Sequence, residues 1–389
     1  YRAGCLHIVF EIADNSIDEL AVEGSVGNHL DMTFDEVTKA FSVRDDGSGV
    51  PLEKLLDVLT KLAASGKFNN GDGSAYTTSV GRWGHGLKTA VFLSDKCFFK
   101  SMRDGKYKLY RFKDGEMVEE ENGKSNEHGT YSWFHLDQKL MDSHDVSYKD
   151  IDERLQEKSY LFPDLKMTLT VYKDGKEFKK FKYGGVDIEG RVKLWKPDTD
   201  IIHIEESRKV TFLKSITDDK LTTEKVGINI AFAFKEDVLD ADDRDDYILS
   251  FANGAKTYMG GAHNDGLKLG IQKWFKEIVI PKFKGKDKDL PIMPSDMTAG
   301  LCAFILVKVV DPIYMGQEKA QLSNTEVKTA VRDAVFERLC SEKSSVTNPM
   351  IDFVKRITRG RMASKKSRKK DVDNAFSKDK PEKYKPIIN

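Results

Sequence analysis

Glu11-Ile12-Ala13-Asp14-Asn15-Ser16-Ile17-Asp18-Glu19 is the stretch that decides the fold of this chain. It lies within a predicted helix over residues 4–22, whose side chains divide into two faces. His7, Glu11 and Asn15 are four residues apart and form a polar stripe. Apolar side chains recur at spacings of three, four and seven and form the other stripe, which consists of Leu6, Val9, Phe10, Ala13, Ile17 and Leu20.

The polar stripe combines an imidazole, a carboxylate and a carboxamide in one of the most apolar parts of the chain. We expect these groups to be half buried. Burying them costs free energy unless something binds there. Together they suit a magnesium ion and an activated water molecule. The helix therefore predicts a binding or catalytic site, without specifying its ligand.

Length and composition set broad limits. The chain has 389 residues, more than one ordinary domain, which predicts two domains. Lys plus Arg and Asp plus Glu both total 63, so the net charge favours no class of partner. No apolar run approaches the roughly 20 residues of a membrane helix. Four widely spaced cysteines without a C-x-x-C pair predict buried free thiols rather than a zinc site or disulfide framework.

The pattern of elements changes near Gly184-Gly185. Before it we predict strands at 28–33 and 40–44, helices at about 52–63 and 87–93, and an antiparallel sheet over 96–136. Beyond it, strands at 227–234 and 301–310 alternate with helices at 267–279 and 324–340. We therefore expect domains over 1–185 and 186–354. Residues 355–370 contain nine basic and no acidic residues, so 355–389 is predicted to be a linker or a helix that faces nucleic acid or solvent.

Two glycine motifs follow the first helix. Asp45-Asp46-Gly47-Ser48-Gly49 ends a strand; its glycines allow close approach of a flat ligand, and an Asp can accept a hydrogen bond from an amine such as that of adenine. A plain Asp-Gly hairpin turn is the alternative.

The second motif opens into a helix, where backbone N–H groups favour phosphates; it consists of Gly81-Arg82-Trp83-Gly84-His85-Gly86. Its spacing fits neither a P-loop nor a dinucleotide-binding motif, and a flexible surface loop is the alternative.

In this order, within 90 residues, the three elements resemble the ATP-binding motifs of the GHKL, or Bergerat-fold, ATPases. The stretch from Gly4 to Glu19 is most similar to the gyrase B and topoisomerase IV ATPase subunits of type IIA topoisomerases. Leu62–Phe68 resembles the start of their ATP lid, and Ser250–Asn253 with Gly260–Gly266 resembles their transducer domain. The resemblance implies an α+β protein: a Bergerat α/β sandwich with a mixed sheet, then a ribosomal-S5-like α/β transducer domain, leading toward a TOPRIM region.

The resemblance also implies roles for the residues of the first helix. Glu11 would be the general base for the water that attacks the γ-phosphate, and His7 would hold or tune Glu11. A histidine buried in the core is the alternative for His7. Asn15 would bind Mg²⁺, while Asp45 would recognise the adenine amino group with help from Thr130.

The remaining implied contacts are with the nucleotide and its phosphates. Lys319 of the Gly316-Gln317-Glu318-Lys319 loop would reach the γ-phosphate from the second domain, with Gln317 beside it. The other nucleotide-binding positions would be Gly47, Gly49, Lys67, Gly81, Arg82, Trp83, Gly84, His85 and Gly86. The family usually has Arg where Ser48 stands, and that Arg commonly pairs with the acid corresponding to Glu19.

The implied activity is that of an ATP-dependent gate. Two chains would dimerise on ATP and close on a segment of double-stranded DNA, which passes through a break made by a cleavage subunit or by downstream domains. The resemblance implies a cytoplasmic, nucleoid-associated protein without a membrane partner, and a viral or plasmid source fits its divergence. The chain starts without Met and carries no TOPRIM segment or cleavage tyrosine, so we expect a fragment that does not cut DNA by itself. A MutL-like or MORC-like clamp and an ATP-binding module without turnover are the alternatives.

Overall fold

The computed structural model describes residues 2–22, 24–61, 86–140, 146–195, 197–213, 221–235, 247–316, 319–341 and 344–378. The chain forms two compact units. Unit 1 consists of residues 1–191 with 253–255, and unit 2 consists of residues 192–252 and 256–389. None of the described helices combines the length and the apolar character that crossing a bilayer requires.

Unit 1 is built on one large sheet. Its strands are β1 (His29–Asp35), β2 (Phe41–Asp45), β3 (Ser94–Arg103), β4 (Lys106–Lys113), β5 (Glu116–Lys124), β6 (Gly129–Leu136), β7 (Lys166–Lys173) and β8 (Lys176–Tyr183). They lie in the order β5-β4-β3-β6-β2-β1-β7-β8. Neighbours are antiparallel except β1 and β7, which are parallel, so the sheet is mixed, as predicted.

Local sequence explains the hairpins of this sheet. Asp104-Gly105, Asp114-Gly115 and Asp174-Gly175 connect β3 to β4, β4 to β5 and β7 to β8, and both residues of each pair have positive φ. Positive φ at both central positions is the requirement of a tight type I′ turn, which Asp-Gly meets at low cost. These turns fix the register of the strands that follow them.

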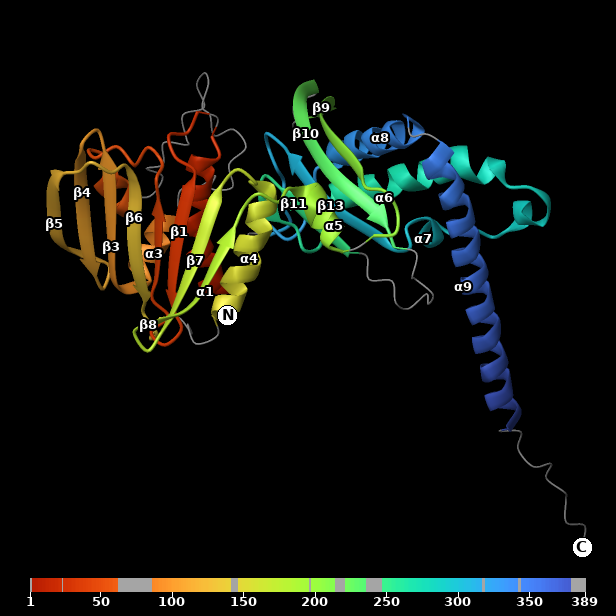
Figure 1. The fold of residues 1–389 in the computed structure, drawn as a ribbon, viewed down its shortest axis with the longest axis horizontal. Helices are drawn as coiled ribbons and strands as arrows, with labels where there is room; N and C mark the ends of the chain where they lie inside the picture. The colour runs from red at the N-terminus through yellow and green to blue at the C-terminus, as the bar shows by residue number, and fades with distance from the viewer. Residues whose placement is uncertain are drawn as a thin grey trace, which may run out of the picture. The chain divides into compact units, whose positions relative to one another are not determined.

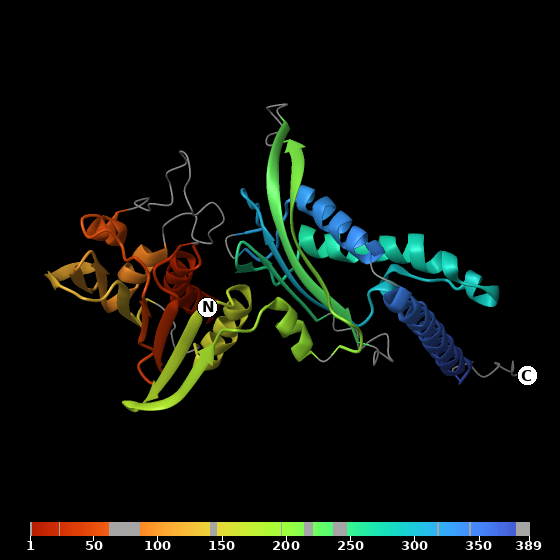
Figure 2. The same cartoon turned by 45° about the horizontal axis from the view of Figure 1, so that its top comes forward.

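The helices of unit 1 are α1 (Arg2–Leu20), α2 (Leu55–Thr60), α3 (Gly86–Phe92) and α4 (Tyr148–Leu161), with α5 (Ile188–Leu194) at the boundary in sequence. Figures 1 and 2 together show α1 and α3 on one side of the sheet. The predicted apolar stripe of α1 is confirmed: Phe10, Ala13 and Ile17 are at most 1% exposed and belong to the core of the unit. Burying this stripe leaves the polar stripe of the same helix at the edge of the core.

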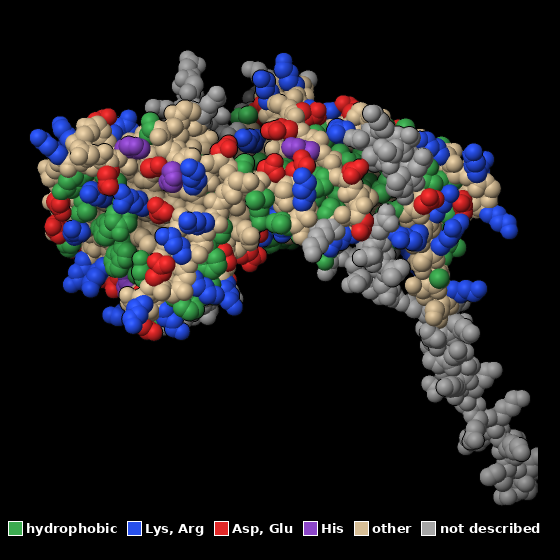
Figure 3. Space-filling model, in the orientation of Figure 1, with side chains coloured by type: hydrophobic (Ala, Val, Ile, Leu, Met, Phe, Trp, Pro, Cys, Tyr) green, Lys and Arg blue, Asp and Glu red, His purple; other side chains and the backbone are tan. Residues whose placement is uncertain are grey.

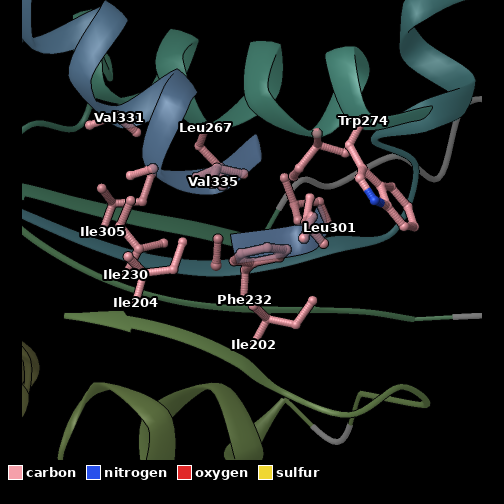
Figure 4. Close-up of a cluster of buried hydrophobic side chains, with 14 of the residues drawn as sticks. Ile202, Ile204, Ile230, Phe232, Leu267, Trp274, Leu301, Ile305, Val331 and Val335 are labelled. Carbon is pink, nitrogen blue, oxygen red and sulfur yellow. The ribbon is translucent and has the colours of Figure 1, made fainter. Parts of the chain in front are cut away.

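Unit 2 contains a second, five-stranded sheet. Its strands β9 (Ile202–Leu213), β10 (Leu221–Phe234), β11 (Tyr247–Ala252), β12 (Ala255–Lys256) and β13 (Leu301–Lys308) lie in the order β12-β11-β13-β10-β9. Helices α6 (Ala262–Trp274) and α8 (Thr325–Ser341) cover this sheet. Figure 4 shows Leu267 of α6 and Val335 of α8 pointing toward Ile230 and Ile305 of the sheet. The central strand β13 is buried on both faces except at Lys308, which explains its unbroken apolar sequence.

The basic C-terminal run is helical. Helix α9 spans Ser344–Lys378, so the helical alternative of the prediction holds at least to Lys378. Part of its charge is used within unit 2. Lys355 and Arg359 bind Asp287, and Arg361 Nε lies 2.8 Å from Oδ1 of Asp296, which is fully buried. The run is therefore partly a structural element and is less free for DNA than its sequence suggests.

Two details predicted from the sequence need correction. The helix expected at 267–279 begins earlier, at Ala262, and its last five residues, Phe275–Val279, form a π-helical turn. Cys340 is exposed, whereas the other three cysteines are buried free thiols, as expected. The half burial expected for the polar stripe agrees with His7, of whose side chain 53% is exposed to solvent.

Candidate functional site

The polar stripe of α1 forms a short hydrogen-bonded ladder. His7 Nε2 lies 3.3 Å from Glu11 Oε1, and 26% of the Glu11 side chain is exposed. Asn15 Nδ2 donates to the backbone carbonyl of Glu11 at 2.6 Å. This bond fixes the carboxamide and leaves its Oδ1 as the atom available to a ligand. The exposure of His7 excludes the alternative of a core histidine.

Helix α3 begins directly against Glu11. A Cβ atom built on Gly86 would lie 2.2 Å from Glu11 Oε2 and 2.6 Å from Glu11 Cβ. No larger residue fits at this position without displacing the carboxylate or the helix. The end of the second glycine motif therefore lies beside the acid of the first helix.

Asp45, at the end of β2, is the centre of a second cluster. Its side chain is 4% exposed. Oδ1 accepts hydrogen bonds from the backbone N–H groups of Gly47 (3.0 Å) and Thr130 (3.1 Å), and Oδ2 accepts from the hydroxyls of Ser16 (2.7 Å) and Thr130 (2.5 Å). All four groups are donors, so they hold the carboxylate as an acceptor at a fixed place.

The first glycine motif also packs tightly on its surroundings. A Cβ atom on Gly47 would lie 3.0 Å from Cγ of Glu19, which is on α1. Gly49 has a φ of +73°, and a Cβ atom there would lie 2.6 Å from the carbonyl oxygen of Met102. Gly49 is therefore required both for its backbone conformation and for its close contact with β3.

Ser16 connects the two clusters, and the sequence analysis did not identify it. It follows Asn15 directly, is buried, and places its hydroxyl on Asp45. A signal was present in the sequence. Ser16 is three residues after Ala13 and four before Leu20, so it occupies the apolar stripe, where a polar side chain requires a buried partner.

Lys88 was also missed as a functional residue. It lies on α3, two residues after Gly86, and its side chain is 3% exposed. Among the described residues its Nζ has no hydrogen-bond partner. Burial lowers the pKa of Lys88, because an ammonium without a partner is poorly stabilised away from water. This buried cation beside the start of α3 has the charge to bind an anionic group.

The Ser48 and Glu19 positions also form a contact. The Ser48 hydroxyl donates a short hydrogen bond to Oε1 of Glu19. The acid on α1 is thus bound by a small neutral donor at the position where the resemblance leads one to expect arginine. Nothing in this contact disrupts the Asp45 cluster.

Several predicted residues cannot be placed. Lys67, Gly81, Arg82, Trp83, Gly84, His85 and Gln317 lie outside the described residues. Lys319 is described and belongs to unit 2, where its backbone adopts a φ of +55° and its N–H donates to the carbonyl of Gly316 at 3.4 Å. Their roles stay predictions.

Comparison with protein families matches both parts of the chain. Residues 5–145 match the family described as histidine kinase-, DNA gyrase B-, and HSP90-like ATPase. Residues 193–370 match the DNA gyrase B family. The first match contains α1 and the Asp45 cluster, and the second contains most of unit 2.

Individual relatives agree with these matches. The DNA gyrase B protein of Campylobacter jejuni is 30% identical over 380 residues, which cover 94% of this chain and 46% of that protein. The DNA topoisomerase IV B protein of Staphylococcus epidermidis is 29% identical over 397 residues, covering 95% of this chain and 56% of that protein. The chain thus spans about half the length of the curated relatives it matches.

Solved structures show the same fold. The 43K ATPase domain of Thermus thermophilus gyrase B aligns with a TM-score of 0.62 at 22% identity, covering 93% of this chain and 92% of that domain. The topoisomerase IV ATP-binding domain of Francisella tularensis aligns with a TM-score of 0.61 at 23% identity, covering 92% of each. The predicted α+β fold is confirmed, and so is the resemblance of the two parts of the chain to the ATPase and transducer region of DNA gyrase B and topoisomerase IV B.

Proposed function

We propose that this chain binds and hydrolyses ATP as the gate of a type II DNA topoisomerase. The observation that carries the proposal is the packing of Glu11 against Gly86. It brings a carboxylate next to the first residue of the helix that follows the glycine-rich loop. Because helix starts favour phosphate groups, Glu11 is well placed to act as general base for a water molecule that attacks the γ-phosphate. His7 would orient Glu11 from the preceding turn.

The Asp45 cluster would recognise adenine. An ionised carboxylate has about four lone-pair sites, and the protein's own donors use four. Two of these donors are the hydroxyls of Ser16 and Thr130, which can rotate. An exocyclic amino group would replace one hydroxyl on Oδ2, and the displaced hydroxyl would turn toward the base or toward water. Gly47 and Gly49 would leave room for the base.

A magnesium ion fits the residues present on α1. Among the described residues, no group of three or more His, Cys, Asp or Glu side chains could hold a metal. Asn15 offers one fixed carboxamide oxygen. Mg²⁺ is often held by one or two protein oxygens together with water and substrate phosphates. Asn15 would therefore supply the protein ligand, and the ion would neutralise phosphate charge.

The output would be a nucleotide-dependent gate on double-stranded DNA. Lys319 would contact the γ-phosphate from unit 2, and hydrolysis would remove that partner. The link between the units would thereby depend on the nucleotide. Two copies would dimerise on ATP and act with a cleavage subunit or downstream domains. A MutL-like or MORC-like clamp has no specific observation in its favour.

Steady-state phosphate release from the purified chain tests this proposal. ATP turnover should require Mg²⁺ and should exceed turnover of GTP, because guanine presents a carbonyl oxygen at the position where adenine presents the amino group that would donate to Asp45. Asp45→Asn should weaken ATP binding while the protein stays folded, since the amide keeps the shape of the side chain but presents a donor in place of one acceptor oxygen. Absence of nucleotide binding by the wild-type chain would contradict the proposal.

A further inference from the structure

The side of the unit 1 sheet that faces away from α1 and α3 has an unusual composition. Phe98 on β3 and Tyr131, Trp133 and His135 on β6 alternate with side chains of the buried face, such as Phe99 and Phe134. None of these four rings belongs to the core cluster of the unit or packs against it. Each is only partly exposed, because the rings cover one another. The stability of the core therefore does not explain why these rings are present.

The four rings form one continuous group. The centroid of Phe98 lies 5.2 Å from that of Tyr131, in an edge-to-face arrangement, and 6.3 Å from that of Trp133, with the planes 13° apart. Trp133 continues to His135 at 6.4 Å with the planes 12° apart. Register explains the contacts, because Phe98 lies directly opposite Trp133 in the β3–β6 pair. The result is a fixed aromatic surface across two central strands.

Positive charge borders this aromatic surface. Arg111 lies over Phe98 and Arg44 over Tyr131, with guanidinium carbons 5.8 and 6.0 Å from the ring centroids. Both arginines also bind glutamates, Arg111 with Glu119 and Arg44 with Glu127. Figure 3 shows hydrophobic side chains gathered over β3, β4 and β6, with Lys and Arg side chains beside them.

Exposed lysines on the same face add positive charge, although the register also places Glu116 opposite Lys113. Register places Lys96 beside His135 and Lys113 beside Lys96, while Lys180 and Lys182 extend the face across β8. These four lysines are exposed, and among the described residues none has an ion-pair partner. The face thus combines partly exposed rings with free cations, whereas the opposite face is filled by the core.

We propose that this face, with Phe98 and Trp133 at its centre, binds single-stranded nucleic acid. Unpaired bases stack on aromatic rings, and lysines track the phosphates. Duplex DNA is a poorer occupant, because its bases are already stacked on one another and a flat surface can reach only its phosphates. The proposal is independent of the ATP site, which lies among α1, α3 and Asp45.

Fluorescence anisotropy of a labelled 12-nucleotide oligo-dT with the full chain in low salt tests the proposal. Trp133→Ala and Phe98→Ala should each weaken binding roughly fivefold or more, the effect of losing one stacked base. Trp133→Phe should retain most of the affinity because it keeps a ring. Lys96→Glu should make the slope of log K against log[salt] shallower by about 0.7, because one phosphate contact is lost. Since these residues lie outside the core, the variants should fold, which circular dichroism can verify.

Matched control variants distinguish binding at this surface from nonspecific attraction between positive charge and nucleic acid. Phe178→Ala removes an aromatic side chain that is 50% exposed on β8, and Lys286→Glu reverses an exposed charge in unit 2; both should leave oligo-dT binding unchanged. Glu11→Ala should also leave it unchanged. The proposal is overturned if oligo-dT does not bind, if the ring variants bind as tightly as wild type, or if a 12-base-pair duplex binds more tightly than the single strand.

Discussion

Replacing Gly86 with alanine tests how the two halves of the ATP site are joined. The new methyl group would lie 2.2 Å from Glu11 Oε2 and 2.6 Å from Glu11 Cβ. The carboxyl end of Glu11 can rotate away. Its Cβ cannot, because it is attached to the backbone of α1. The substitution must therefore turn the proposed general base out of place and also separate the start of α3 from α1.

The size of the effect follows from these two contacts. Inserting a methyl group into a packed contact costs roughly 1–3 kcal/mol, so the free energy of unfolding should fall by about that amount. A misplaced general base loses its contribution to the rate, which is roughly 10²- to 10⁴-fold. We expect ATP turnover to decrease by at least about 100-fold, while most of the protein stays folded at 25 °C.

Phosphate release and urea unfolding of the same preparations measure both effects. Gly360→Ala is the matched control, because nothing lies within 4 Å of a Cβ atom at that helical position. It should raise stability slightly, by about 0.5–1 kcal/mol, and leave turnover unchanged. Wild-type turnover in Gly86→Ala would refute the inference that Glu11 and the start of α3 form one site.

Three further predictions concern buried charged or titratable groups. Lys88→Met should weaken ATP binding by about tenfold or more in an equilibrium titration, yet leave the free energy of unfolding unchanged or higher, because it removes a buried ammonium that has no hydrogen-bond partner among the described residues. Asp296→Asn should lower the free energy of unfolding by roughly 3 kcal/mol in urea titrations, since it leaves the buried Arg361 without its charged partner. Burial lowers the pKa of His263 from 6.5 to about 4. Between these values the unfolded chain takes up a proton that the folded chain does not, so stability should fall by about 3 kcal/mol as the pH decreases from 6.5 to 4. His263→Gln should flatten this pH dependence.

Local pattern predicted much of the fold and part of the site. The spacing of apolar residues placed α1 and its buried stripe. Strand patterns predicted the antiparallel sheet over 96–136, where β3, β4, β5 and β6 lie. Glu11 and Asn15 could be identified because they lie one helical turn apart on the same face of a single helix. Such features depend on residues close in sequence, so one sequence is enough to show them.

The rest depends on contacts between residues far apart in sequence. Thr130 reaches Asp45 across 85 positions and was named only through the family resemblance, whereas Ser16, which reaches it across 29 positions, was not named. The aromatic face of β3 and β6 depends on strand order, which a periodic pattern does not reveal. Half burial of the polar stripe was expected from its apolar neighbours, but the pattern did not show that 53% of the His7 side chain would be exposed. Its exposure depends on how α1 packs, and helical periodicity does not fix that.

The most direct test of the central claim uses Glu11→Ala, with nucleotide binding and a single turnover measured on the same sample. ATP should bind within a few-fold of wild type, because Asp45 and its donors remain, and phosphate release should slow by roughly 10²-fold or more. A non-hydrolysable ATP analogue provides the control for binding. Phosphate release at the wild-type rate, with binding intact, would show that Glu11 is not the general base and would contradict the account.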